Sequence, residues 1–204
     1  MYGSLVFGDV EHHHPCKLVP EAAPWVIALD GVSKAFAGTG LRVGWLTAAP
    51  PVTARMKDLI GHMGAWAPRA EQVAVAEFLR DEGALRSFRG QMMVRVRDRL
   101  QALYRGFTAM TEDGYPVDCI SPQGAIYLSL HIDVVGRTLD GKTIDSNEAI
   151  RRLLLDRAGV AVVPFQAFGL QEETGWFRIS VGAVSLEDIE QVFPRLRALL
   201  DELS

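Results

Sequence analysis

The chain lacks the features that mark membrane-spanning and secreted proteins. No apolar run among its 204 residues is long enough to cross a bilayer. The first seven residues carry no basic group ahead of their apolar side chains, so they do not resemble a secretion signal. Only two cysteines occur, Cys16 and Cys119, and they have no metal-ligand spacing. The sequence therefore predicts a cytoplasmic protein with free thiols and no membrane partner.

Concentrated positive charge is also missing. The formal net charge is -4, and the arginines between residues 85 and 107 are interleaved with a stripe of apolar residues. That pattern is typical of the solvated face of an amphipathic helix. We therefore expect no direct nucleic-acid partner.

One histidine cluster invites a metal-site hypothesis. Glu11 is followed by His12, His13 and His14. Adjacent side chains point in different directions, and no acidic or cysteine ligand stands at helical spacing nearby. The pattern favours a surface segment over a metal site.

What the chain does have is enough apolar material, 49% of its residues, for a sizeable core. Apolar runs predict short strands at residues 4–7, 25–29, 43–46, 117–120, 125–132, 159–163 and 177–181. Apolar residues at helical spacing predict helices from Pro50, in the segment between Pro68 and Gly83, over 85–107, after Ser146 and after Ser185. We read residues 1–84 as one layered α/β domain, 85–107 as a long connecting helix and 108–204 as a small α+β domain.

The most informative stretch runs from Asp30 to Trp45. A lysine stands just past the end of the first of two apolar runs, an arginine follows eight residues later, and glycines fill the loop between them. Such a loop offers donors for an anion and room for a ligand. Its pattern resembles the cofactor-lysine motif of class I/II aminotransferases, which use pyridoxal phosphate. The matching residues are Ser33, Lys34, Phe36, Thr39, Gly40, Arg42 and Gly44.

The resemblance continues in order through nearly the whole chain. Gln72 matches a glutamine often found in the helix after the lysine loop. Residues 121–128, 153–169 and 176–181 resemble three small-domain segments of the family, the last with Arg178 at the position of the arginine that binds the substrate carboxylate. Two positions depart from the family pattern. Gly31 stands where many relatives have a phosphate-binding hydroxyl, and Phe165 replaces the usual glycine after a proline.

The resemblance implies both a fold and a set of roles. The fold would be the fold type I of pyridoxal-phosphate-dependent transferases, an α/β fold. A partial large domain with an incomplete mixed sheet would precede a complete small domain. Lys34 would be the Schiff base lysine and the catalytic proton carrier, while Ser33 and Arg42 would hold the cofactor phosphate. Tyr2 would bind the cofactor's phenolic oxygen, and Arg178 the substrate carboxylate.

The family's amino-terminal segments have no counterpart in this sequence. Among them are the aspartate that protonates the pyridine nitrogen and the helix start that holds the phosphate. The resemblance therefore implies the carboxy-terminal half of an aminotransferase, weakly active or inactive alone. Its half-sheet is expected to expose apolar surface and to pair with another chain or copy, the family's usual state being a dimer.

Three other functions remain open from the sequence. The same scaffold supports carbon–sulfur lyases, and it serves as the effector domain of some transcription regulators. A structural or assembly protein is the third possibility. Transamination between an amino acid and a 2-oxo acid is the leading hypothesis.

Overall fold

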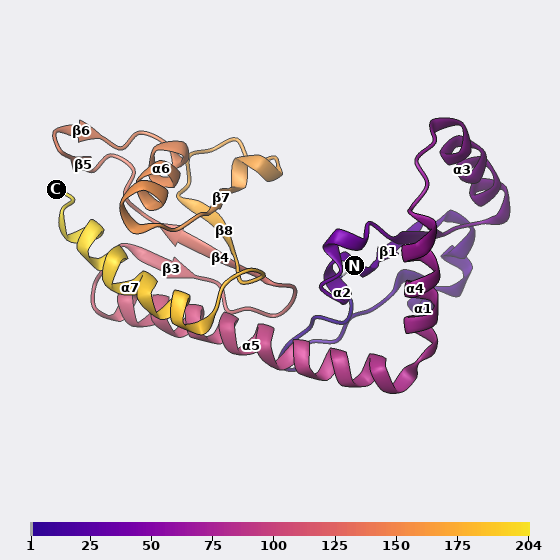
Figure 1. The fold of residues 1–204 in the computed structure, drawn as a ribbon. Coiled ribbons are helices and arrows are strands. Elements are labelled where there is room, and N and C mark those ends of the chain that lie inside the picture. The colour runs from indigo at the N-terminus through magenta and orange to yellow at the C-terminus, as the bar shows by residue number, and fades with distance from the viewer. Residues whose placement is uncertain (1) are drawn as a thin grey trace. The chain divides into compact units, whose positions relative to one another are not determined.

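The structure is a computed structural model that describes residues 2–204. The chain folds as two compact units, Met1–Val94 and Arg95–Ser204, which are described separately (Figure 1). Helix α5 (Glu82–Glu112) contributes to both. None of the helices within residues 2–204 is long and apolar enough to cross a membrane.

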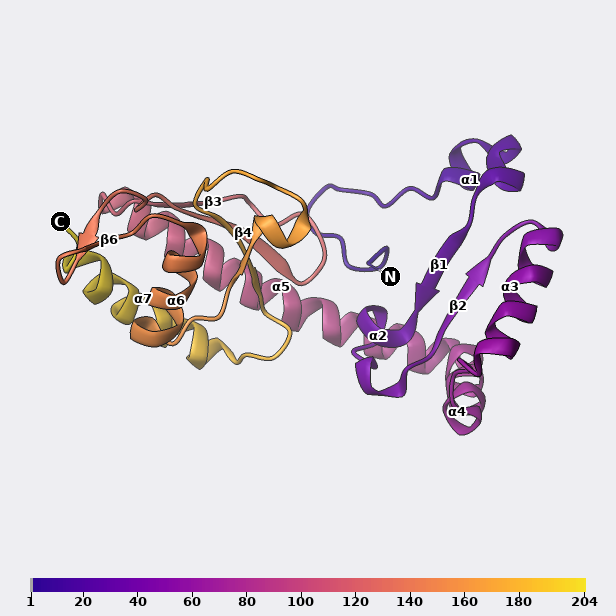
Figure 2. The ribbon, with the colours of Figure 1, turned by 90° about the horizontal axis from the view of Figure 1, so that it is seen from above.

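Within residues 2–94, the first unit is built around one antiparallel pair of strands, which Figure 2 shows side by side. Before α5, its elements are α1 (Pro15–Leu18), η1 (Pro20–Trp25), β1 (Ala28–Gly31), α2 (Val32–Ala35), η2 (Thr39–Leu41), β2 (Gly44–Thr47), α3 (Pro50–Met63) and α4 (Arg69–Arg80). β1 and β2 pair antiparallel, with Asp30 opposite Trp45 and Gly31 opposite Gly44. An isolated two-stranded sheet is only marginally stable in water.

The apolar packing of this unit is correspondingly small. Val32, Val43 and Val75 form a buried cluster, with Phe36 and Leu79 among the partly buried residues packed against it. Large apolar side chains remain in solvent around the strands, including Trp25 with 88% of its surface exposed, Leu29 with 68% and Trp66 with 59%. The strand pair is thus an incomplete sheet, and its exposed apolar surface agrees with the expectation of a partial large domain.

The second unit has a fuller architecture. Its elements after α5 are β3 (Val117–Cys119), β4 (Tyr127–Ile132), β5 (Thr138–Leu139), β6 (Lys142–Thr143), α6 (Asn147–Ala158), β7 (Val163–Pro164), η3 (Phe165–Phe168), β8 (Trp176–Ser180) and α7 (Leu186–Asp201). Four strands form an antiparallel sheet in the order β3-β4-β8-β7. This α+β arrangement was predicted from the sequence.

Two helices of this unit pack closely side by side, α5 and α7 (Figures 1 and 2). The rings of Phe107 and Phe193 meet edge to face, with their centroids 5.4 Å apart. Gly106 makes this approach possible, since a Cβ there would lie 2.0 Å from an atom of the Phe193 ring. Close packing of ring against backbone fixes the position of α7 on α5.

Several boundaries differ from the sequence prediction. Residues 4–7 do not form a strand: Leu5 donates its amide to the carbonyl of Tyr2 in a turn, although its side chain is buried. The run predicted at 25–29 becomes a strand only at Ala28, because Pro20 and Pro24 place a 3₁₀ helix before it. The strand predicted over 159–163 is paired only at Val163 and Pro164.

Candidate active site

The segment that carries Lys34 begins at the end of β1, where β1 and β2 lie unusually close together. The amide of Gly31 is held by the Asp30 carboxylate at 2.8 Å, and its Cα faces Gly44 on the neighbouring strand. A Cβ at position 31 would lie 3.0 Å from the carbonyl oxygen of Val43. The glycine that departs from the family pattern therefore suits the close approach of β1 and β2, where a Cβ would require the neighbouring strand to shift by a few tenths of an ångström.

Lys34 lies on the short helix α2, which directly follows β1. Val32 and Ala35 anchor the helix, with only 1% and 8% of their surfaces exposed. This leaves Ser33 and Lys34 half-buried, and within residues 2–204 neither the Ser33 hydroxyl nor the Lys34 amine has a hydrogen-bond or ion-pair partner. The segment therefore presents a free amine beside a free hydroxyl.

Phe36, the residue that directly follows α2, is held by contacts with other aromatic side chains. The ring of Phe36 meets that of Phe78 edge to face at 5.4 Å and that of Phe88 at 6.3 Å. The guanidinium of Arg89 lies 5.1 Å from the centre of the Phe36 ring. Together with the buried residues of α2, this cluster holds the backbone on both sides of Lys34.

Arg42 ends the loop in an uncommon backbone conformation. Its φ of 54° and ψ of 34° are left-handed, and its Nη1 donates a hydrogen bond to the carbonyl of Thr39 at 2.9 Å. Its guanidinium has no carboxylate partner among the described residues and is exposed, so its other N–H groups can bind an anion. No hydrogen bond joins Arg42 directly to Lys34; the two residues are linked through the loop.

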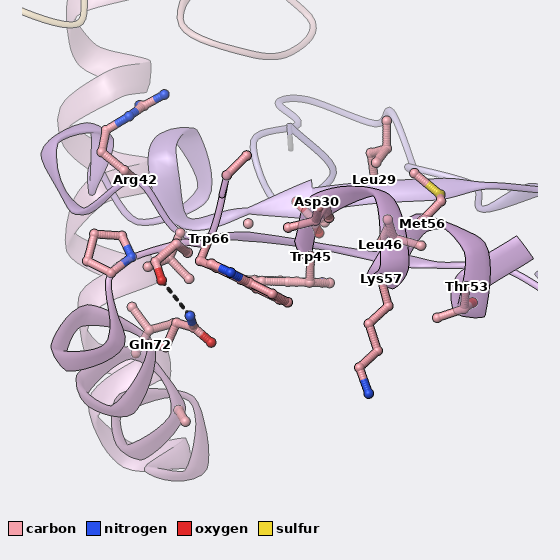
Figure 3. Close-up of a pocket in the computed structure, with 18 of the residues that line it drawn as sticks. Leu29, Asp30, Arg42, Trp45, Leu46, Thr53, Met56, Lys57, Trp66 and Gln72 are labelled. Atoms are coloured by element: carbon pink, nitrogen blue, oxygen red, sulfur yellow. Dashed lines mark hydrogen bonds between the residues drawn. The ribbon is translucent and has the colours of Figure 1, made fainter. Parts of the chain in front are cut away.

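A broad groove of the first unit is not lined by Lys34. This groove, of about 940 Å³, is bordered by Trp45, Trp66, Arg42 and Gln72 (Figure 3). Figure 3 shows the Arg42 guanidinium extending away from the two indole rings. The Gln72 amide donates to the carbonyl of Ala67 at 2.6 Å, which makes it a brace of the α4 start. The groove is the uncovered apolar side of the incomplete sheet rather than a place for a polar ligand.

Tyr2 and the cluster of His12, His13 and His14 were the other candidate site residues in the amino-terminal part of the chain. Tyr2 is half-buried, and its carbonyl accepts the amide of Leu5. The His14 ring accepts the amide of Cys16 at 3.2 Å and so caps α1. Within residues 2–204, no three His, Cys, Asp or Glu side chains gather in a way that could hold a metal ion.

The second unit places the Arg178 guanidinium against two aromatic rings. Its guanidinium lies 4.3 Å from the centre of the Tyr127 ring and 4.5 Å from that of Phe168. Because Ser129 stands opposite Arg178 in the register of β4 and β8, the two share one face of the sheet. The Arg178 Nε atom is buried and has no hydrogen-bond partner within residues 2–204.

A small cavity of about 280 Å³ surrounds this arginine. Phe165 lines it together with Tyr127, Ser129 and Phe168. The Phe165 ring also stacks near Trp176, with centroids 6.2 Å apart, so the residue that replaces the family's glycine adds an aromatic wall to the Arg178 cavity. With two rings this close to the guanidinium carbon, much of the space around Arg178 is taken by aromatic side chains, and a ligand is expected to bind through the N–H groups that the rings leave open.

Sequence reasoning missed two supports of these residues. Thr39 was matched to the motif without a structural role, yet its hydroxyl donates to the Ser33 carbonyl at 3.0 Å. Asn147 was not noticed at all, because an asparagine after a helix-capping serine gives no sign of a distant partner. It is 1% exposed and binds two segments that lie 19 and 28 residues further along the chain.

The comparisons with known proteins agree on one family. Residues 1–196 match the family described as aminotransferase class I and II. The chain is 31% identical to an aspartate aminotransferase of Streptomyces avermitilis over 99% of this chain and 47% of that protein. It is also 31% identical to an aspartate/prephenate aminotransferase of Cereibacter sphaeroides, over 100% of this chain and 49% of that protein.

Solved structures give the same result. The aspartate aminotransferase of Rhizobium meliloti superposes with a TM-score of 0.81 at 27% identity, covering 100% of this chain and 49% of that one. The aromatic aminotransferase of Pyrococcus horikoshii superposes with a TM-score of 0.83, also at 27% identity, covering 99% and 50%. The chain thus spans about half the length of the relatives it matches. By these matches in sequence and fold, the chain belongs to the aminotransferase class I and II family.

Proposed function

We propose that this chain carries the cofactor lysine and the substrate-binding arginine of an aminotransferase that moves an amino group between an amino acid and a 2-oxo acid. Family membership supports the reaction, and the family depends on pyridoxal phosphate. The matched aminotransferases favour transamination over the lyase and regulator alternatives. The observation that carries the proposal is the half-buried, unpartnered amine of Lys34.

The residues of the lysine loop fit the cofactor. Pyridoxal phosphate has an aldehyde, which suits an amine, and a phosphate, which suits hydroxyl and guanidinium donors. Lys34 offers the amine, while the Ser33 hydroxyl and the N–H groups of Arg42 that are not used by Thr39 offer donors. Tyr2 is proposed as a further contact, to the cofactor's phenolic oxygen.

When bound, the cofactor supplies an electron sink for the bonds at the substrate's α-carbon. The side chains supply position and proton transfer. Lys34 Nζ is proposed to take a proton from the substrate's α-carbon as general base and would then, as general acid, release it to the cofactor carbon that had carried the aldehyde oxygen. Arg178 is proposed to hold the substrate's α-carboxylate through two parallel N–H bonds, an in-plane geometry that the flanking Tyr127 and Phe168 rings favour.

Domain roles follow from the same resemblance. We propose that residues 1–84 belong to the large cofactor-binding domain, that 85–107 form the interdomain helix and that 108–204 form the small domain. Because the described β1–β2 pair leaves apolar residues such as Trp25 and Leu29 in solvent, we expect low activity from this chain alone and pairing with further protein. A homodimer in the cytoplasm is the assembly we propose, and the two free cysteines suit that compartment.

Titration of the chain with pyridoxal phosphate tests the lysine assignment. The unaltered chain is expected to shift the visible absorbance of the cofactor, and Lys34→Ala is expected to abolish that shift. Lys57→Ala is the matched control, because Lys57 is an exposed lysine of α3 in the same unit. Equal shifts from Lys34→Ala and from the unaltered chain would overturn the assignment.

A further inference from the structure

We infer that Asn147 is a positioning residue for Arg178, acting through the segment that places Phe168 over the guanidinium. The inference rests on the proposed function for its meaning, since Arg178 is there the carboxylate-binding group. Its structural basis is a chain of contacts that lies entirely within the second unit.

The first link is the burial of Asn147. It is the one polar residue in the buried set of the described chain, with 1% of its surface exposed. Burying an amide without partners is costly, so a buried asparagine is held by its hydrogen bonds. Its side chain satisfies both ends: Nδ2 donates to Gln166 Oε1 at 2.9 Å, and Oδ1 accepts the amide of Gly175 at 2.9 Å.

These two partners stand near the ends of one irregular segment. Gln166 lies in η3, and Gly175 directly precedes β8. Gln166 adds a bond from Nε2 to the carbonyl of Glu172 at 2.6 Å, and the amide of Asn147 itself donates to the carboxylate of Glu173. The buried Asn147 side chain therefore holds the segment 166–175 at both ends, and the Gln166 side chain joins the start of the segment to Glu172.

Phe168 is carried by this segment. Its ring is 55% exposed, so packing around it does little to hold it in place. It nevertheless lies 4.5 Å from the Arg178 guanidinium and forms one wall of the 280 Å³ cavity. The backbone that Asn147 fixes through Gln166 therefore determines whether Phe168 covers Arg178.

The position of Phe168 affects the orientation of the Arg178 guanidinium. The rings of Tyr127 and Phe168 both lie within 4.5 Å of the guanidinium carbon, so each restricts the rotation of the guanidinium. If Phe168 moved away, the guanidinium would rotate more freely. Binding a carboxylate through two hydrogen bonds would then cost more conformational entropy. We therefore expect loss of Asn147 to weaken carboxylate binding at a site that it does not touch.

The test is the Nε–H signal of Arg178 in ¹H–¹⁵N NMR spectra of the whole chain, assigned with Arg178→Lys. Two flanking rings displace this signal upfield. We expect Asn147→Ala to move it toward the position of a free arginine. We expect Gln166→Met to do the same, because it removes the amide that binds both Asn147 and the Glu172 carbonyl. Ile150→Val is the matched control, because Ile150 lies on the same helix, is also 1% exposed and is expected to leave the signal unchanged.

The outcomes separate this inference from the proposed function. An unmoved Arg178 signal in Gln166→Met or in folded Asn147→Ala, or an equal movement in Ile150→Val, would overturn the positioning role. Addition of sodium pyruvate, with sodium chloride at equal ionic strength as reference, tests the carboxylate site. We expect pyruvate to shift the signal of the unaltered chain, with an apparent affinity severalfold weaker in the two amide variants. No response in the unaltered chain would contradict the carboxylate role proposed for Arg178, while the ring-dependent displacement would still decide the role of Asn147.

Discussion

The hydroxyl of Thr39 donates a hydrogen bond to the carbonyl oxygen of Ser33, at 3.0 Å. The carbonyl of the same threonine accepts a hydrogen bond from Arg42 Nη1, at 2.9 Å. Thr39 therefore joins the helix that carries Lys34 to the guanidinium proposed to hold the phosphate. Loop rigidity of this kind lowers the entropy lost when a ligand binds.

Replacement of Thr39 tests that link. Thr39→Val keeps the shape of the side chain but removes the donor, so we expect the affinity for pyridoxal phosphate to fall about fivefold, as for the loss of one hydrogen bond worth about 1 kcal/mol. Absorbance titration measures it. Thr39→Ser retains the donor and is expected to bind as the unaltered chain does; equal affinities for the valine and serine variants would show that the bond has no role.

Gly175 is expected to tolerate no side chain. Its φ is +71°, and a Cβ would lie 2.5 Å from the carbonyl oxygen of Ile132. Gly136 has a similar φ of +88°, but a Cβ there would have no neighbouring atom within 4 Å, so Gly136→Ala isolates the backbone strain. We expect Gly136→Ala to lower the free energy of unfolding by about 1 kcal/mol and Gly175→Ala by about 3 kcal/mol. Thermal or urea unfolding measures both, and equal losses would contradict the close contact with β4.

Cys119 is expected to be a slow nucleophile. Burial, and secondarily the neighbouring Asp118 carboxylate, raise the pKa of its thiol to about 11, against an ordinary value of 9.0. Both causes disfavour the thiolate, which is the reactive form. At pH 8 we therefore expect alkylation by iodoacetamide about 100-fold slower than that of a free cysteine, because each pKa unit is a factor of ten in thiolate. The rate should rise about tenfold for each pH unit up to pH 10.

Asp118→Asn provides the control for this prediction. Removing the carboxylate takes away one of the two causes that raise the thiol pKa, so alkylation of Cys119 should become faster at pH 8. Peptide mass spectrometry separates this rate from that of Cys16. A rate that matches free cysteine in the unaltered chain would mean that the thiol is not buried as the structure places it.

Much of the fold could be predicted because its signals are local. The helix after Ser185 begins with a capping box in which the serine hydroxyl and the Asp188 carboxylate each accept a backbone amide, as the sequence spacing indicated. Ser146 likewise caps α6 through the amide of Ala149. Both caps act within four residues, so no knowledge of the distant chain was needed.

The strands were predicted less accurately than the helices, because an alternating or continuous apolar pattern indicates which side chains are buried but not which backbone segments pair. Leu5 and Phe7 are buried, but between them only Val6 forms an isolated bridge, and turns on either side prevent a strand. Val160 and Val162 are buried too, yet only the next two residues pair with β8. Pairing depends on where a second strand lies, and this information is not in the local sequence.

Only those residues of the candidate site that lie in a recognisable sequence motif could be predicted. Lys34 and Arg178 came from a resemblance, and their roles remain proposals. Asn147 could not be found in the same way, because its partners Gln166 and Gly175 are brought to it only by the folded segment before β8. Positioning residues of this kind become visible in a structure through burial and hydrogen bonding.

The central claim is that Lys34 is the lysine that binds the cofactor, and peptide mapping tests it most directly. The chain has four lysines, Lys17, Lys34, Lys57 and Lys142, which serve as internal controls for one another. Incubation with pyridoxal phosphate, reduction with borohydride and mass spectrometry of the digested chain give the share of label on each. The account predicts that the label concentrates on Lys34 at low cofactor concentration, while an even distribution over the four lysines would contradict it.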